Sequence, residues 1–330
     1  MFRAYPWMAL RGAIAVASAV AFTIAPSLAQ NYPARPITVV VPGAPGGATD
    51  AFGRALAQSM SKSMGQTVIV ENKPGASGLL AGQTVAQAAP DGYTILLTHG
   101  TPIQNAPHMG KVPYNVRKDF AFIAQIGSGP LLLAVNPSIP AKNMQEFLAW
   151  AQANKGKLSY GSYGAGSSGH LLSAYLNQSR NLDMAHAAYK GEAQLLQDMI
   201  GGHVPWGIAT MGSLAPFLAS GQLRALAIAS EKRSSDFPDV PTMVEAGLTD
   251  PEFKPSGWFG VLAPAATPAP VLAELEKHAL AALQSPGMTQ LFKTYATMVT
   301  GLGSEAFRRE FEASDPVIAR LIELSGAKQE

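Results

Sequence analysis

The sequence predicts an α/β fold built as two lobes, each a mostly parallel sheet flanked by helices. Two observations carry this prediction. Short apolar strand patterns alternate with helix patterns along the chain, and a glycine-rich turn follows a strand at residues 43–47 and again at residues 161–169. The order strand–helix–strand recurs around both turns, and this order predicts parallel strands joined by crossover helices. The 330 residues are enough for two cores.

Each element is justified by its local pattern. Residues 37–41 form a β-branched run that ends at Pro42, which predicts a buried strand, and an apolar side chain at every fourth position predicts a helix over 50–64, ended by Gly65. Similar patterns predict strands at 67–70, 93–98, 158–160, 223–229 and 258–262, apolar runs at 122–126 and 131–135 with glycines between them, and helices at 79–89, 143–153, 170–178, 193–200, 271–283, 288–295 and 304–324.

The N-terminus has the features of a removable secretory leader. Arg3 and Arg11 give a basic start, residues 13–28 are small and mostly apolar, and Ala29 closes a small-x-small cleavage site. The apolar run is short for a membrane span and ends near a proline. We therefore expect cleavage near Ala29 and a periplasmic location for the mature chain, which would begin at Gln30.

Composition excludes several function classes. The leader holds two arginines and no acid, so 22 basic residues face 22 acidic ones in the mature chain, and no basic tract favours nucleic acid. The absence of cysteine excludes disulfides and thiolate chemistry. None of the six histidines belongs to a metal-binding spacing, so neither a metal nor another cofactor is expected.

Two enzymatic interpretations of the second turn are weak. Gly164, Gly166 and Gly169 match the dinucleotide fingerprint, but the preceding strand is short and polar. A secreted hydrolase is the main alternative, yet no Gly-x-Ser-x-Gly occurs, and Ser168 and His170 are two positions apart and do not face each other on a helix. The sequence therefore predicts no catalytic residue.

Backbone amides at the two turns predict an anion site instead. Glycine lets N–H groups point into open space, and the start of a helix favours negative charge. His99 follows the strand at 93–98, and the carboxyl ends of parallel strands face the ligand crevice. Trp258 and Phe259 are interpreted as core residues. Two such turns facing each other predict a clamp for a small anion.

At these residues the chain resembles the extracytoplasmic solute receptors, known as Bug-type, of the tripartite tricarboxylate transporters. The resemblance runs from residue 32 to the C-terminal helix. It depends on the number and order of short motifs, found at 32–37, 41–50, 70–76, 88–94, 112–114, 118–120, 156–162, 189–191, 223–227, 238–242, 258–260 and 263–264.

The resemblance implies a two-lobe periplasmic binding protein, a Venus flytrap of type II-like design, that acts as a monomer and passes an organic carboxylate to a membrane permease. Residues 30–126 with 257–330 would form lobe one, and 127–256 lobe two, after a signal peptide at 1–29. The implied ligand-binding residues lie in the turns and at the strand ends, and they are Ala44, Gly46, Gly47, Ala48, Thr49, Thr98, His99, Thr101, Gly164, Gly166, Ser167, Ser168, His170, Tyr189, Lys190, Gly191, Ala209 and Thr210.

Departures from the family pattern bear on the ligand. Relatives often carry an Asp-Asn pair where this chain has Ala209 and Thr210, and Trp206 adds apolar bulk nearby. Glu192, at a helix start, is expected to cap or to face water. A desolvated ammonium group needs a carboxylate or several acceptors. We therefore expect a mono- or dicarboxylate without an amino group, with an apolar or aromatic body favoured.

Overall fold

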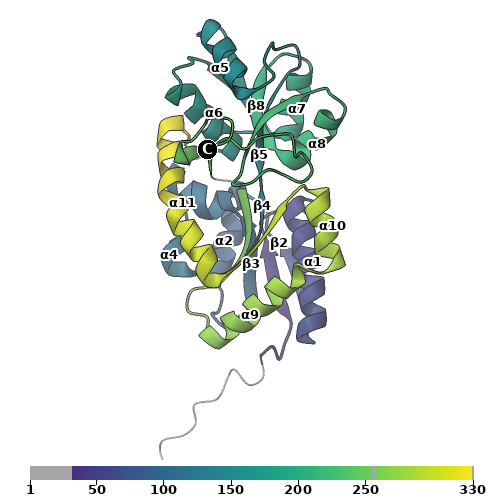
Figure 1. The fold of residues 1–330 in the computed structure, drawn as a ribbon. Coiled ribbons are helices and arrows are strands. Elements are labelled where there is room, and N and C mark those ends of the chain that lie inside the picture. Colours follow the sequence, from purple (N-terminus) through teal and green to yellow (C-terminus); the bar gives the residue numbers. More distant parts are fainter. Residues whose placement is uncertain (1–31, 255–256, 329–330) are drawn as a thin grey trace, which may run out of the picture. The chain divides into compact units, whose positions relative to one another are not determined.

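Two mixed sheets organise the fold, one with six strands and one with five, and helices flank each of them (Figure 1). The computed structural model describes residues 32–254 and 257–328, so the predicted leader lies outside the described residues. The chain from Pro33 onward forms a single unit. Within the described residues no helix has both the length and the apolar character that crossing a bilayer requires.

The six-stranded sheet, which we call the sheet of the first lobe, has the order β11-β4-β10-β3-β1-β2. Its strands are β1 (Ile37–Val41), β2 (Val68–Asn72), β3 (Thr94–His99), β4 (Phe120–Gly129), β10 (Gly257–Pro264) and β11 (Met298–Gly303). The helices on this side of the chain are α1 (Ala48–Met64), α2 (Leu79–Ala86), α3 (Ala106–Met109), α4 (Val116–Asp119), α9 (Ala269–Ala282) and α10 (Pro286–Thr294).

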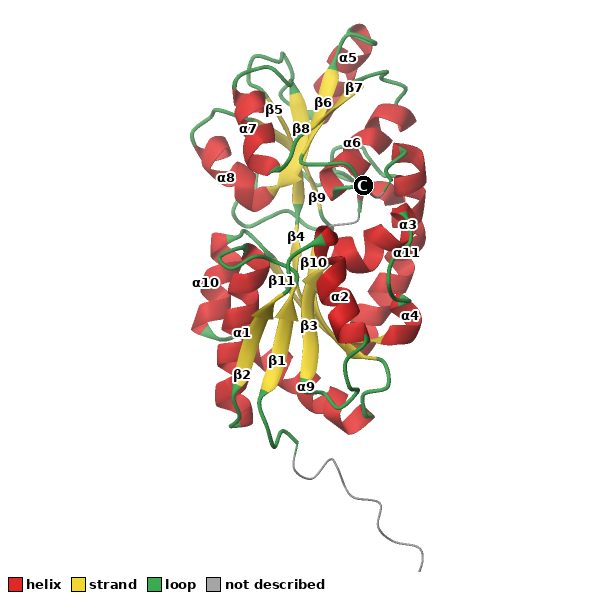
Figure 2. Cartoon of the chain, turned by 180° about the vertical axis from the view of Figure 1, so that it is seen from behind, coloured by secondary structure: helices red, strands yellow, loops and turns green. Residues whose placement is uncertain are grey.

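The five-stranded sheet, the sheet of the second lobe, has the order β7-β6-β8-β5-β9. Its strands are β5 (Leu131–Val135), β6 (Ser159–Ser162), β7 (Ala185–Ala188), β8 (Trp206–Thr210) and β9 (Arg224–Ala229). The accompanying helices are α5 (Met144–Ala153), α6 (Ser168–Ser179), α7 (Glu192–Ile200) and α8 (Met211–Ala219). Figure 2 shows the two sheets and their helices from behind.

The α/β class and the two lobes are confirmed, but the sheets are mixed and not mostly parallel. β1 pairs in parallel with β2 and β3, whereas β10 runs antiparallel to β3 and β4, and β11 runs antiparallel to β4. In the second sheet β5 is antiparallel to both its neighbours. The cause is the chain path: β4 leaves for the second sheet and β10 returns from it, so the two strands lie side by side in opposite directions.

The chain crosses between the sheets at glycine- and proline-rich points. Only Pro130 separates β4 from β5. The sequence predicts an interruption from residue 127, but β4 continues to Gly129 because Gly127 and Gly129 pair with β10. A Cβ at Gly127 would lie 2.8 Å from the Thr297 side chain, so the strand needs glycine there. The predicted lobe boundaries at 126/127 and 256/257 stay a prediction.

The C-terminal helix α11 (Ser304–Ser325) packs on both cores and lies alongside both sheets (Figures 1 and 2). Phe307 and Phe311 belong to a core cluster of the first lobe. Ile318, Leu321 and Ile322 belong to the main core cluster of the second lobe. One continuous helix therefore contributes apolar side chains to two separate cores.

Several elements have no sequence signal. β7 (Ala-His-Ala-Ala) lacks β-branched residues and is a largely exposed edge strand. β8 contains a glycine, and α8 begins directly after it and contains Pro216. β11 contains Gly301 at a positive φ, which interrupts its pattern. These elements depend on pairing and packing partners that are distant in sequence.

A close approach of helix and strand positions the start of α6. At Gly169 a Cβ would lie 2.1 Å from the carbonyl oxygen of Ile208 in β8. Only glycine allows this approach, because backbone cannot move aside as a flexible side chain can. The first turn of α6 is therefore held directly against β8.

We predict that Gly169→Ala destabilises the protein by about 2 kcal/mol or more, because the added methyl group overpacks the α6–β8 contact. Gly287→Ala is the matched control, since Gly287 lies in α10 and its Cβ would meet only Ala55 at 3.7 Å. This control should raise stability by up to about 1 kcal/mol. Urea unfolding measures both changes. Equal effects of the two substitutions would contradict the close approach.

Candidate functional site

A cavity of about 160 Å³ lies where strand ends from both sheets meet. His99 and Thr210 line it at the carboxyl ends of β3 and β8, and Gly129 lines it at the end of β4. Leu131 and Trp258 line it at the beginnings of β5 and β10. Ligand crevices of open α/β sheets occur at this edge.

Three hydrogen-bond donors from the two lobes line the cavity, and we call them the donor region. His99, Thr101 and Ser168 all line the cavity. The Thr101 amide donates to Nδ1 of His99 over 3.3 Å, so the ring proton of neutral His99 resides on Nε2. Burial lowers the pKa of His99 to about 4, and the ring is neutral at pH 7. Nε2–H of His99 and the Thr101 hydroxyl can therefore donate to an anion, and the Ser168 hydroxyl, which also bonds the Tyr163 hydroxyl, lies in the same cavity wall.

Thr101 begins a π-helix, Thr101–Asn105, which follows β3 after Gly100. Single π-helical turns occur frequently at functional sites. Both Gln104 and Asn105 are buried and line the cavity. Gln104 accepts from the indole N–H of Trp258 at 2.9 Å and donates to the Ser314 hydroxyl at 2.7 Å. This bonding fixes the indole of Trp258 in the cavity wall.

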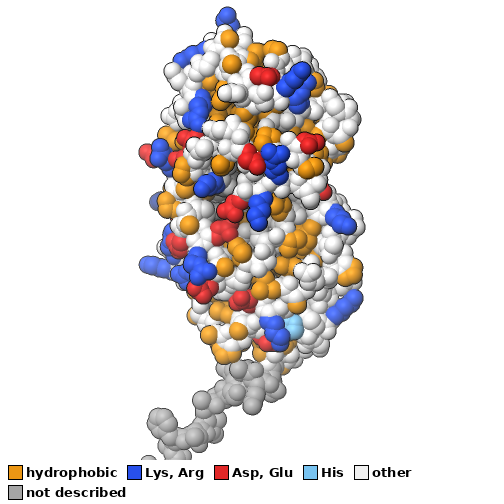
Figure 3. Space-filling view, in the orientation of Figure 1, with side chains coloured by type: hydrophobic (Ala, Val, Ile, Leu, Met, Phe, Trp, Pro, Cys, Tyr) orange, Lys and Arg blue, Asp and Glu red, His pale blue; other side chains and the backbone are white. Residues whose placement is uncertain are grey.

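The rest of the wall is apolar. Leu171 and Leu172 follow Ser168 by one turn of α6, and Ile318 and Leu321 come from α11. Among the described residues that line the cavity, none is Lys, Arg, Asp or Glu. On the face of the molecule that Figure 3 shows, charged side chains of both signs are interspersed. A ligand in this cavity meets neutral donors and hydrocarbon.

The first glycine turn is closed by a carboxylate of the chain itself. Asp50 accepts from the Gly46 amide, from the Arg54 guanidinium and from the Asn72 amide, at 2.9, 3.0 and 2.9 Å. Arg54, with Gly46 and Asn72, lowers the pKa of Asp50 from 3.8 to about 2 despite its burial. The Asp50 carboxylate thus holds the turn in shape and takes up one of its amides.

The second turn is also bonded internally. The Gly166 amide donates to Nδ1 of His170 at 3.1 Å, and the Gly169 amide donates to the Tyr163 hydroxyl at 3.1 Å. Ser167 is the N-cap of α6, accepting from the His170 amide at 3.2 Å. The second turn therefore has fewer amides free for a ligand than its glycine content predicts. The first residue of α6, Ser168, lines the cavity.

A second acidic side chain caps the end of β8. Glu192 accepts from the Thr210 amide at 2.9 Å and from the Thr210 hydroxyl at 2.7 Å, and it also accepts from the Ser213 hydroxyl. The sequence predicts that Glu192 caps a helix or faces water. It is the first residue of α7, but its carboxylate bonds Thr210, which is the N-cap of α8. Its carboxylate is held by three donors beside the cavity.

His170 packs inside the second lobe. Its ring stacks on that of His186 at 4.0 Å, and His186 stacks on Tyr160 at 5.0 Å. Burial, with a smaller effect of His186, lowers the pKa of His170 to about 4. His170 thus acts as a neutral acceptor for the Gly166 amide and shapes the turn from within.

The predicted site residues fall into two groups. His99, Thr101, Ser168 and Thr210 line the cavity. The others lie beside it or elsewhere: Ala44, Gly46, Gly47, Ala48 and Thr49 in the first turn and the start of α1, Thr98 and Ala209 buried in β3 and β8, Gly164, Gly166, Ser167 and His170 in the second turn and α6, and Tyr189, Lys190 and Gly191 between β7 and α7.

Other lining residues carry no functional signal in the sequence. Trp258 and Phe259 are interpreted there as core residues, but both line the cavity. Ile318 and Leu321 belong to an ordinary amphipathic helix pattern. Only the position of Gln104 after the strand that ends at His99 could have indicated a site.

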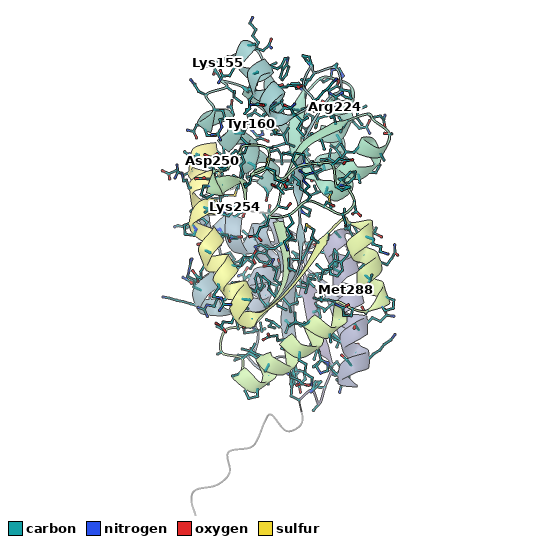
Figure 4. All side chains as sticks on the ribbon, in the orientation of Figure 1. Lys155, Tyr160, Arg224, Asp250, Lys254 and Met288 are labelled. Carbon is teal, nitrogen blue, oxygen red and sulfur yellow. The ribbon has the colours of Figure 1, made fainter. Side chains whose placement is uncertain are left out.

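A second, wider hollow of about 510 Å³ is polar and is lined by α6, by residues that follow α5 and by the end of α11. Figure 4 labels two of its residues, Lys155 and Tyr160, on the second lobe. None of the predicted site residues lines it. In the part of the chain that the structure describes, no group of three His, Asp or Glu side chains is arranged to hold a metal ion.

Comparisons with known proteins agree on one family. The family model "Tripartite tricarboxylate transporter family receptor" matches residues 52–306. Protein BugT of Bordetella pertussis strain Tohama I is 37% identical over 285 residues, covering 86% of this chain and 87% of BugT.

Two solved structures are similar over nearly the whole chain. An R. palustris protein solved with adipate is 29% identical with a TM-score of 0.74, covering 90% of this chain and 99% of that one. MatC from Rhodopseudomonas palustris, solved with malate, is 31% identical with a TM-score of 0.69, covering 89% and 100%.

The network around Asp50 yields a pH-dependent prediction. Because the folded-state pKa is depressed, the stabilising contribution of Asp50 is complete above pH 3.8 and is lost as the pH falls to about 2. Asp50→Asn should therefore cost about 2 kcal/mol at pH 7, and the difference from the parent should shrink between pH 4 and pH 2. Denaturant unfolding across this range measures it, with the exposed Asp239→Asn as control. A difference independent of pH would contradict the assignment.

Proposed function

The chain belongs to the family of tripartite tricarboxylate transporter receptors, and we infer that it captures a small organic carboxylate between its two lobes and delivers it to the membrane permease of such a transporter. The cavity supports this inference, because its walls come from both lobes and its donors are neutral. Fixed neutral donors bind a carboxylate while losing little entropy.

The neighbourhood of Glu192 favours a ligand without an amino group. An ammonium group in a closed cavity needs a carboxylate or several acceptors. The carboxylate of Glu192 already accepts from Thr210 and Ser213. Ala209, which precedes Thr210 in β8, is buried and has no polar side chain. Within the small organic carboxylates, we therefore propose a mono- or dicarboxylate without an ammonium group as the ligand.

The hydrolase alternative finds no support in the geometry. Ser162 Oγ lies 2.8 Å from Nε2 of His186, the distance of a serine–histidine pair. Ser162, however, has no exposed surface, so its hydroxyl cannot reach a substrate. His170 Nδ1 accepts from the Gly166 amide and is unavailable as a base. A receptor that returns its ligand unchanged fits these contacts.

Location and assembly complete the proposal. The relatives of this chain form a family of transporter receptors, and the N-terminal sequence has the pattern of a signal peptide. We place the mature protein in the periplasm as a monomer, cleaved near Ala29, with the permease subunits as its protein partners. It needs no cofactor for binding.

The ligand class is tested with matched pairs of acids. Calorimetry should show tighter binding of succinate than of aspartate, and of aromatic acids than of the corresponding aromatic amino acids. A ligand at about 100 times its Kd should stabilise the native state by about 2.7 kcal/mol. Mass spectrometry should recover the ligand unchanged. Preference for the amino acids, or turnover, would overturn this proposal.

The donor set is tested with Thr101→Val, which removes one hydroxyl from the cavity wall and keeps the side-chain shape. Loss of one hydrogen bond to a charged group should weaken carboxylate binding about tenfold or more. Thr84→Val is the matched control, since Thr84 bonds the Leu80 carbonyl within α2. Unchanged affinity in the Thr101 variant would place the carboxylate elsewhere.

A further inference from the structure

We propose that one wall of the cavity restricts the ligand to an acid with a single carboxylate and an uncharged hydrocarbon body. This wall, which we call the α6–α11 wall, consists of Leu171, Leu172, Ile318 and Leu321. The proposal rests on the proposed function and narrows it, because it names which carboxylates the site takes and which residues select them.

The polarity of the cavity changes along α6. Ser168 is the first residue of the helix, and Leu171 and Leu172 follow at i+3 and i+4, so all three lie on one face. One turn of helix, about 5.4 Å, therefore separates the donor at the helix start from the first apolar side chains. A carboxylate held at Ser168 directs the body of its ligand along this face.

Helix α11 closes the apolar end. Ile318 and Leu321 are at i and i+3 and lie on the same face of α11. Both are buried with Leu171 and Leu172 in the same core cluster. Apolar side chains from two helices thus meet around one end of the cavity, and this end stabilises hydrocarbon by removing it from water.

Two side-chain amides of the cavity wall, those of Gln104 and Asn105, are partly taken up by hydrogen bonds within the chain. Both amide atoms of Gln104 are bonded, to Trp258 and to Ser314. Asn105 directs its amide nitrogen to the Gly166 carbonyl at 3.5 Å, so each of these two amides donates one N–H within the chain and keeps one. A second carboxylate placed against the four apolar side chains of the α6–α11 wall would lose its hydration and meet only hydrocarbon there, which is costly.

The size of the cavity sets the size of the body. In another protein an apolar cavity of about 150 Å³ holds one benzene molecule. The cavity of about 160 Å³ therefore suits a six-carbon chain or one ring beside the donor region. Hexanoate and benzoate are probes of this chemistry, and adipate and benzene-1,4-dicarboxylate are their matched dicarboxylates.

Calorimetry with these four acids tests the proposal. We expect the monocarboxylate of each pair to bind at least tenfold more tightly than its dicarboxylate. Equal or tighter binding of the dicarboxylates would overturn the proposal and leave a carboxylate receptor standing. If none of the four acids and no other carboxylate binds, the proposed function fails as well.

Two buried neighbours on α11 provide a matched pair of variants. Leu321 lines the cavity, whereas Ile322 lies in the same core cluster without lining it. Leu321→Ala should weaken hexanoate and benzoate binding roughly tenfold or more, because lost methylenes in an apolar pocket cost at least this factor. Ile322→Ala should leave affinity within about twofold while losing similar stability.

A milder variant keeps the test open if Leu321→Ala does not fold. Ile318→Val removes one methylene from the α6–α11 wall and should weaken benzoate binding severalfold. Benzoate affinity that is equal in the parent and in the variants of both lining residues would overturn the role of this wall.

Discussion

Helix α11 is the constraint on which the site depends, because its two halves pack on different lobes. Phe307 and Phe311 contact the first core, whereas Ile318 and Leu321 enter the second. Pro316 lies between these halves and lacks the N–H that would bond the Glu312 carbonyl. The helix therefore joins the two cores and also supplies one wall of the cavity.

Further contacts along α11 anchor the helix to both lobes. Asp315 accepts from Arg117 at 2.7 Å and lies 2.8 Å from His108 Nε2, on the first-lobe side. Arg320 lies 3.2 Å from the carboxylate of Glu252, which belongs to the short 3₁₀ helix Pro251–Phe253 of the second lobe. Figure 4 shows the neighbouring Asp250 beside this end of α11. These charges position the helix, and none of them lines the cavity.

Two carboxylates of the chain itself already accept hydrogen bonds at helix starts beside the site. Asp50 takes up an amide of the first turn, and Glu192 takes up the amide and hydroxyl of Thr210. Both acids occupy helix starts that would otherwise attract an anion. The start of α6 has no acidic residue in its first turn, and its first residue, Ser168, lines the cavity. This arrangement directs a ligand carboxylate to one place.

The sequence was sufficient for features that depend on local pattern. Apolar periodicity predicted α1 and β1, and the position after a strand pointed to His99, whereas Thr101 was implied by the resemblance; both residues line the cavity. The sequence was insufficient for features that depend on contacts between residues distant in the chain. β7 exists because β6 pairs with it, and Leu321 becomes a wall residue only because α11 meets α6 beside the cavity. An i,i+3 apolar pair looks the same in any core helix. The mixed character of the sheets was not predicted, because the direction of β4 and β10 is set by where the chain passes from one sheet to the other.

A crystal structure of the protein with bound benzoate tests the central claim most directly. The account predicts the carboxylate within hydrogen-bond distance of His99 Nε2 and Ser168, with the ring against Leu171 and Leu321. A carboxylate bound at the first turn, on the amides of Gly46 to Thr49 and away from α11, would contradict it.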